Sequence, residues 1–107
     1  MSDINFFVDN IKDPIQLLHS QKIWYEEKYL NLIKNYCIPG STIVDVGANI
    51  GNHSLYFSKH CDPKIIYPIE PVGINYKHLL CNMSINYCKN INYDYIDSSL
   101  GSQSEVR

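Results

Sequence analysis

The feature that most constrains this chain is a glycine-containing turn. It joins a β-branched run to a segment of mixed polar and apolar residues. The run is Thr42 to Gly47, the turn is Gly47 to Gly51, and the segment from Asn52 to His60 contains no helix breaker. A short β-branched run that ends in glycine is typical of a strand buried on both faces of a parallel sheet. The sequence therefore predicts a strand, a tight turn and a helix in immediate succession.

Helices and strands alternate through the rest of the chain. Asp13 and Pro14 match the capping residue and the first position of a short helix. Hydrophobic periodicity predicts helices at 21–36 and 73–88, and strands at 64–69 and 91–96. Each of the two helices has an apolar face. In the first helix this face consists of Tyr25, Tyr29, Leu32, Ile33 and Tyr36. In the second it is the expected core stripe of Tyr76, Leu79, Leu80, Met83 and Tyr87.

This order of elements predicts an α/β fold with a doubly wound parallel sheet of the Rossmann-like kind. A complete sheet of this kind has about six strands, so we expect a fold truncated after the third strand. The first strand then keeps one open edge. Pro68 lies inside the second strand and has no N–H to donate, and we expect the strand pairing beside Glu70 to loosen or to end early.

Composition restricts the kinds of partner. The chain has 107 residues, with 9 Lys and Arg against 11 Asp and Glu and a formal net charge of -2. This leaves no excess of positive charge to neutralise a phosphate backbone, which argues against nucleic acid as the main partner. A helix that spans a membrane needs about 20 apolar residues, and the apolar runs of this sequence are much shorter. The sequence also shows no secretion leader and no metal-binding spacing of Cys and His. We therefore expect a cytoplasmic protein without a membrane segment or a metal site.

The turn and Glu70 together predict a site for a nucleotide-type cofactor. Glycine lets the backbone approach a ligand closely, and the N–H groups at the helix start attract an anionic group. Glu70 ends the second strand, where a carboxylate can accept hydrogen bonds from both ribose hydroxyls. A 2′-phosphate would meet a like charge there, which disfavours NADP. Asn49 stands where the dinucleotide fingerprint requires glycine, which disfavours NAD, although Asn tolerates the positive φ of a tight turn.

Four blocks of the sequence resemble FkbM-type methyltransferases, and the resemblance covers about residues 23–105. Ile43 to Phe57 resembles the family's S-adenosylmethionine-binding signature, and Ile69 to Pro71 resembles its acidic residue followed by proline. Leu79 to Asn86 resembles its L-x-x-N-x-x-x-N helix, and Ser99 to Gly101 resembles its A-L-G turn. The four blocks keep their order and spacing, which makes the resemblance more specific than a glycine turn alone.

The resemblance implies an enzyme that transfers the methyl group of S-adenosylmethionine to a small-molecule acceptor, commonly a hydroxyl of a sugar or natural product. It implies a helical lead-in at 1–22 and, at 23–107, the cofactor-binding half of an incomplete methyltransferase domain. Gly47, Ala48, Asn49 and Gly51 would cradle the methionine part, with Asn52 closing the turn segment, Asp45 near the amino group, Glu70 at the ribose, and Asp97 and Ser98 near the adenine. No catalytic base is identified.

Three further residues are expected to have no part in catalysis, and a second hypothesis gives the chain a non-catalytic function. His53 follows the turn but has no acid or base partner in the sequence, so we expect a structural or surface role. Asn82 and Asn86 are expected at a helix end rather than at a ligand. The second hypothesis is a remnant that binds adenosine-type ligands and works only when a partner chain covers the open edge of the first strand. The acceptor and the oligomeric state are left open.

Overall fold

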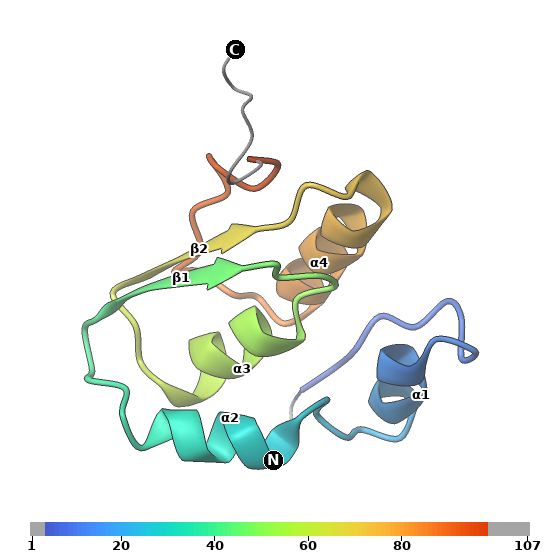
Figure 1. Ribbon diagram of the computed structural model, residues 1–107, viewed down its shortest axis with the longest axis horizontal. Coiled ribbons are helices and arrows are strands. Elements are labelled where there is room, and N and C mark those ends of the chain that lie inside the picture. Colours follow the sequence, from blue (N-terminus) through green and yellow to red (C-terminus); the bar gives the residue numbers. More distant parts are fainter. Residues whose placement is uncertain (1–3, 99–107) are drawn as a thin grey trace.

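The computed structural model describes residues 4–98, and Figure 1 shows how their elements are arranged. The elements are α1 (Pro14–Ser20), α2 (Glu27–Lys34), β1 (Thr42–Val46), α3 (Asn52–His60), β2 (Ile65–Ile69) and α4 (Gly73–Ile85). The α3 helix has the predicted bounds, both strands lie where expected, and α4 ends slightly early. Asp13 caps α1 as predicted, because its carboxylate accepts a hydrogen bond from the backbone N–H of Gln16 at 2.9 Å. No helix within residues 4–98 is long and apolar enough to cross a membrane.

The sheet is parallel, as predicted. β1 pairs with β2 in a register that places Val46 opposite Ile69, so both strands end at the same edge. The core lies around α3, whose Leu55 packs with Leu79 and Met83 of α4. The turn after β1 and the residue after β2 are thereby brought to one side of the molecule, where parallel α/β sheets bind their ligands.

The third strand expected at 91–96 is reduced to a single bridge between Ile66 and Ile91. The backbone N–H and C=O of Ile66 both bond to this segment, each at 2.8 Å. The next residue of β2 that faces this side is Pro68, which has no N–H, and the following segment forms turns instead of a ladder. The prediction of a full third strand is therefore wrong. The loosening expected beside Glu70 affects only this third segment, because β2 pairs with β1 as far as Ile69 and the N–H of Glu70 bonds to the carbonyl of Ile96.

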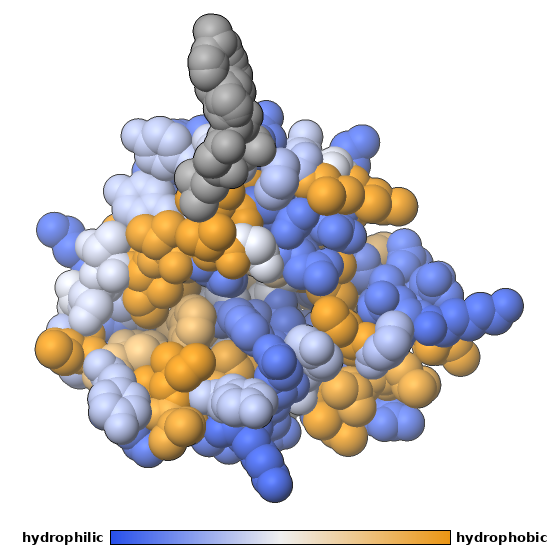
Figure 2. All heavy atoms as spheres, viewed as in Figure 1, coloured by the Kyte–Doolittle hydropathy of each residue, from blue (hydrophilic) through white to orange (hydrophobic). Residues whose placement is uncertain are grey.

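β1 is not buried on both faces, which corrects the sequence-based expectation. Val44 and Val46 are 55% and 58% exposed, whereas Asp45, which points to the opposite face, is buried. Figure 2 shows apolar side chains spread over the region of β1 and α2 on this side of the molecule. Among residues 4–98, only β2 pairs with β1 and no helix covers this face, so the predicted open edge is confirmed.

The helix predicted at 21–36 is shorter, and its other side faces the core. α2 begins at Glu27 because Glu26 has a left-handed backbone with φ of 57°. Its buried residue is Leu30, which belongs to the cluster around Tyr56 and Phe57 of α3. The predicted apolar face is largely exposed, with Tyr29, Leu32, Ile33 and Tyr36 at the surface. Periodicity identified the helix but not the side that packs on α3, since Leu30 lies outside the apolar stripe.

Candidate functional site

The turn after β1 adopts the tight conformation that its glycines and Asn49 predict. Gly47, Asn49 and Gly51 have φ angles of 72°, 54° and 93°, all in the left-handed region. The backbone N–H groups of Gly47 and Ala48 both donate to the carbonyl of Ile69, each at 2.9 Å. These two bonds attach the turn to the end of β2, so the two parts of the predicted site form one rigid unit.

Glu70 lies directly beside this turn, as the sequence predicted. Its side chain is almost fully buried, and Oε1 accepts a hydrogen bond from the backbone N–H of Asn49 at 2.7 Å. Oε2 accepts one from the backbone N–H of Val72 at 3.1 Å. Each carboxylate oxygen can accept more than one hydrogen bond, so Glu70 can hold the turn and still accept from two hydroxyls.

Asp45 is buried behind the turn rather than at the cavity wall. The hydroxyl of Ser54 donates to its Oδ2 at 2.6 Å. Burial raises the pKa of the Asp45 carboxyl, while the Ser54 hydrogen bond and the nearby His53 ring act in the opposite direction. A carboxylate kept charged in this place costs folding free energy, as is common for groups retained at functional sites.

Replacing Asp45 with asparagine is expected to stabilise the fold by about 1 kcal/mol at neutral pH, because an amide oxygen can still accept from Ser54 without a buried charge. Since the pKa of Asp45 in the folded state is raised above 3.8, its ordinary value, stability is lost as pH rises through the folded-state pKa. The gain should vanish near pH 3.8 and grow above it. Thermal melts of both forms across this range check it, with Asp94→Asn, an exposed acid, as control; a less stable D45N at pH 7 contradicts it.

Asn52 has a role that the sequence did not reveal. Its side chain accepts a hydrogen bond from the backbone N–H of Tyr25 at 2.9 Å and donates to the Tyr25 carbonyl at 2.8 Å. The same Oδ1 lies 2.7 Å from Nε2 of His19, a buried ring whose pKa is lowered mainly by burial. Asn52 thus fastens the lead-in segment to the start of α3, and its predicted contact with a cofactor stays a prediction.

Asp97 and Ser98 follow the segment that returns to β2 after Pro68. The backbone N–H of Glu70 donates to the carbonyl of Ile96, so Asp97 begins next to the candidate ribose-binding carboxylate. Asp97 is exposed, and Ser98 is half-buried with its N–H bonded to the Tyr95 carbonyl at 3.0 Å. The predicted turn from Ser99 to Gly101 lies outside the described residues.

Two cavities border the turn. The smaller, about 180 Å³, is lined by Gly47, Ala48, Asn49 and Ile50 of the turn, Asn52 and His53 of α3, and Ile15, Tyr25 and Glu26 of the lead-in and the α2 start. The larger, about 480 Å³, lies between residues 7–16 and the first half of α4, and shares Asn49 and Ile50 with the smaller one. Within residues 4–98 no cluster of three or more metal-ligating side chains is present.

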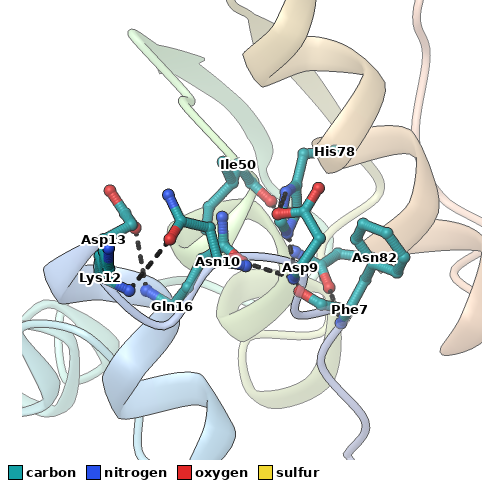
Figure 3. A network of polar contacts seen from close by, with 9 residues as sticks. All are labelled: Phe7, Asp9, Asn10, Lys12, Asp13, Gln16, Ile50, His78 and Asn82. Carbon is teal, nitrogen blue, oxygen red and sulfur yellow. Dashed lines mark hydrogen bonds and ion pairs between the residues drawn. The ribbon is translucent and has the colours of Figure 1, made fainter.

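Polar side chains of α4 bind the backbone of Phe7, a residue that lines the larger cavity, as Figure 3 shows. Asn82 is fully buried, accepts from the N–H of Phe7 at 2.7 Å and donates to the carbonyl of Ile50 at 2.8 Å. Nε2 of His78 lies 2.7 Å from the Phe7 carbonyl. Asn82 therefore lies inside α4, contrary to the expected helix end, whereas Asn86 is the C-cap residue, as expected. A polar stripe at 78, 82 and 86 was the available sequence signal, because these positions share one helical face.

Comparison with known proteins identifies the fold. No protein-family model and no curated protein matches the sequence. The structure of M. jannaschii TYW2 in complex with AdoMet matches with a TM-score of 0.60 and 23% identity over 74% of this chain and 37% of that chain. The chain has a Rossmann-like methyltransferase fold. Methanocaldococcus jannaschii Trm5 in complex with adenosine gives a TM-score of 0.56 and 21% identity over 65% of this chain and 22% of that chain.

A third solved structure extends the comparison to a bacterial protein. YcgJ from Bacillus subtilis has a TM-score of 0.59 and 16% identity, and the match covers 72% of this chain and 33% of that chain. The chain thus spans between 22% and 37% of these three neighbours. The fold and the cofactor type of the neighbours agree with the expectation from the sequence, and the comparisons do not identify the FkbM family or an acceptor.

Proposed function

We propose that this chain forms the cofactor-binding part of an S-adenosylmethionine-dependent methyltransferase of the FkbM type. The acceptor we propose is a hydroxyl of a sugar or small natural product, in a cytoplasmic enzyme that does not act on nucleic acid. One observation carries the proposal: the buried Glu70 carboxylate bonds to the N–H of Asn49, within the glycine turn, at 2.7 Å. The four sequence blocks that resemble FkbM-type enzymes support the narrower assignment.

The roles we propose for the site residues are those that the resemblance to FkbM-type enzymes implies. Glu70 accepts hydrogen bonds from both ribose hydroxyls, while the backbone of Gly47, Ala48, Asn49 and Gly51 lies against the methionine part. Asp45 supplies negative charge behind the turn, near the amino group. Asn52 closes the turn segment, and Asp97 and Ser98 lie near the adenine. The residue ranges proposed for the two parts are 1–22 for the lead-in and 23–107 for the cofactor-binding half.

Methyl transfer demands mainly alignment from the protein. When bound, S-adenosylmethionine supplies a methyl group on a sulfonium, which is already an activated donor. The chain contributes position, because a rigid turn and a preoriented carboxylate hold the donor in one place. The larger cavity shares Asn49 and Ile50 with the turn, and its wall carries the hydrogen-bonding side chains Asp9, Asn10, Asp13, Gln16, Asn75 and Lys77, which suit a hydroxylated acceptor.

Calorimetry with S-adenosylhomocysteine tests the proposal. Replacing Glu70 with alanine removes two charge-assisted hydrogen bonds to the ribose and the bond that holds Asn49, and we expect the affinity to fall about 100-fold. Glu27→Ala, an exposed acid at the start of α2, serves as control and should bind like the wild type. Equal binding by the Glu70 variant removes the ribose assignment. Tighter binding of NAD than of S-adenosylhomocysteine overturns the proposed function.

The second candidate function is a binding module that lacks catalysis and needs a partner chain. The open edge of β1 and the exposed Val44 and Val46 favour it, because an unpaired strand edge can accept a strand from another chain. Amide hydrogen exchange of β1 distinguishes the two. Exchange slowed only after addition of a partner from a cell extract, with no turnover of S-adenosylmethionine by the complex, supports the binding module.

A further inference from the structure

The smaller cavity brings the glycine turn together with a segment in which the sequence suggested no ligand contact. Part of its lining is the turn from Gly47 to Ile50, and another part is Tyr25 and Glu26, just before α2. His53, on the first turn of α3, also lines it. The lead-in and the start of α2 are therefore part of the candidate site rather than a separate packing layer.

The side chains of Glu26 and His53 contact each other at this cavity. Oε1 of Glu26 lies 3.1 Å from Nε2 of His53, and the two side chains are 38% and 34% exposed. Nε2 of His53 is buried, and within the described residues its contact with Glu26 does not have the geometry of a hydrogen bond. Each oxygen of the Glu26 carboxylate can accept more than one hydrogen bond, so the carboxylate can also accept one from a ligand in the cavity.

The backbone at Glu26 is held in a disfavoured conformation. Its φ of 57° and ψ of 39° are left-handed, which is uncommon for a residue with a Cβ and a long side chain. The two hydrogen bonds between Asn52 and the backbone of Tyr25 impose this path on the chain. Strained residues of this type persist where surrounding structure fixes them, and they gather at ligand sites.

We propose that Glu26 binds the ammonium group at the amino-acid end of the cofactor, and that His53 is the positioning residue that holds the Glu26 carboxylate over the turn. The proposal rests on the proposed function, because it assigns a part of the same ligand. An ammonium group offers three donors to a carboxylate, and Glu26 lines the same cavity as Gly47 and Ala48. Of the carboxylates of Asp45 and Glu26, the one that lines this cavity is Glu26.

A surface ion pair alone does not account for these features. Exposed pairs of this kind contribute little to stability, so a gain in stability does not account for the contact between Glu26 and His53. A ligand contact explains why this contact lies at the cavity beside the turn. Asn52 then acts on binding through the backbone of Tyr25, which accounts for its place directly after the turn.

The test compares two ligands on two forms of the full chain. The ligands are S-adenosylhomocysteine and its analogue without the α-amino group, and the forms are the wild type and Glu26→Gln. We expect the substitution to weaken S-adenosylhomocysteine about tenfold and to change the affinity of the analogue less than twofold. Glu27→Gln, next in sequence and exposed, is the matched control and should change neither affinity. His53→Gln should also weaken only the ligand that carries the ammonium group, which a purely structural role would not do.

The outcomes separate this inference from the proposed function. If Glu26→Gln weakens both ligands equally or neither, while Glu70→Ala still loses affinity, the ammonium assignment is wrong and the cofactor site stands. If the wild type binds both ligands equally, the assignment is wrong even without the variants, so a variant that fails to fold does not prevent a decision. If the wild type binds neither ligand, both the inference and the proposed function are overturned.

Discussion

Replacing Gly51 with alanine is expected to destabilise the fold by about 3 kcal/mol, because two separate costs coincide at this position. Its φ of 93° is left-handed, which costs a residue with a Cβ about 1–2 kcal/mol. An added Cβ would also lie 3.0 Å from Cγ of Leu79 and 3.1 Å from Cε of Met83. The side chains of Leu79 and Met83 in α4 are both buried in the core, so neither can move away from the added Cβ without disturbing the packing.

Gly47→Ala is the matched control for this prediction. Gly47 has a φ of 72°, but an added Cβ there meets no heavy atom within 4 Å. We expect a loss of about 1 kcal/mol, from backbone strain alone. Urea denaturation of both variants measures the difference. Equal losses at the two positions would mean that α4 moves freely away from the turn and that the close approach at Gly51 is unimportant.

Replacing Asn82 with leucine is expected to cost about 3 kcal/mol, although leucine has nearly the same size and favours helices. The substitution leaves the N–H of Phe7 and the carbonyl of Ile50 without their partner, and each such loss costs about 1–3 kcal/mol. The effect should extend beyond stability. Phe7 also carries the carbonyl that contacts His78, so residues 4–10 should detach from α4.

Two measurements check the Asn82 prediction. Urea denaturation gives the loss of stability, and amide hydrogen exchange at Phe7 reports whether the N-terminal segment has detached. Asn75→Leu, at a half-buried position of the same helix, is the control and should change stability by less than about 0.5 kcal/mol. A stable Asn82 variant in which the Phe7 amide still exchanges slowly would show that the segment is held by other contacts.

The sequence predicted the parts of the site that depend on local rules. Left-handed backbone at Gly47, Asn49 and Gly51 follows from the residue types that tolerate it. The meeting of Glu70 with the turn follows from parallel strands that end at one edge. The first inference needs only local residue types, and the second needs only the parallel pairing of two consecutive strands, although Glu70 and Asn49 are 21 residues apart in sequence.

The sequence predicted less well which side of a helix faces the core and which residues a side chain contacts, because residues far apart in sequence decide both. The apolar stripe of α2 is exposed, since Leu30 on another side meets α3. The polar residue Asn82 is fully buried, since its two partners, Phe7 and Ile50, come from parts of the chain far from it in sequence. Hydrophobic periodicity carries no information about such partners.

The amino-acid sequence by itself determined the order of strands and helices, the conformation of the turn from Gly47 to Gly51 and the place of Glu70, because these follow from backbone sterics and strand topology. Only the tertiary structure decided that Asn52 holds Tyr25, and that Glu26 and His53 meet at the cavity beside the turn. Asn52 and Tyr25 are 27 residues apart in sequence, and their contact joins the Asn52 side chain to the Tyr25 backbone. Such pairs form only when packing brings separate elements together, and no local preference of the chain encodes them.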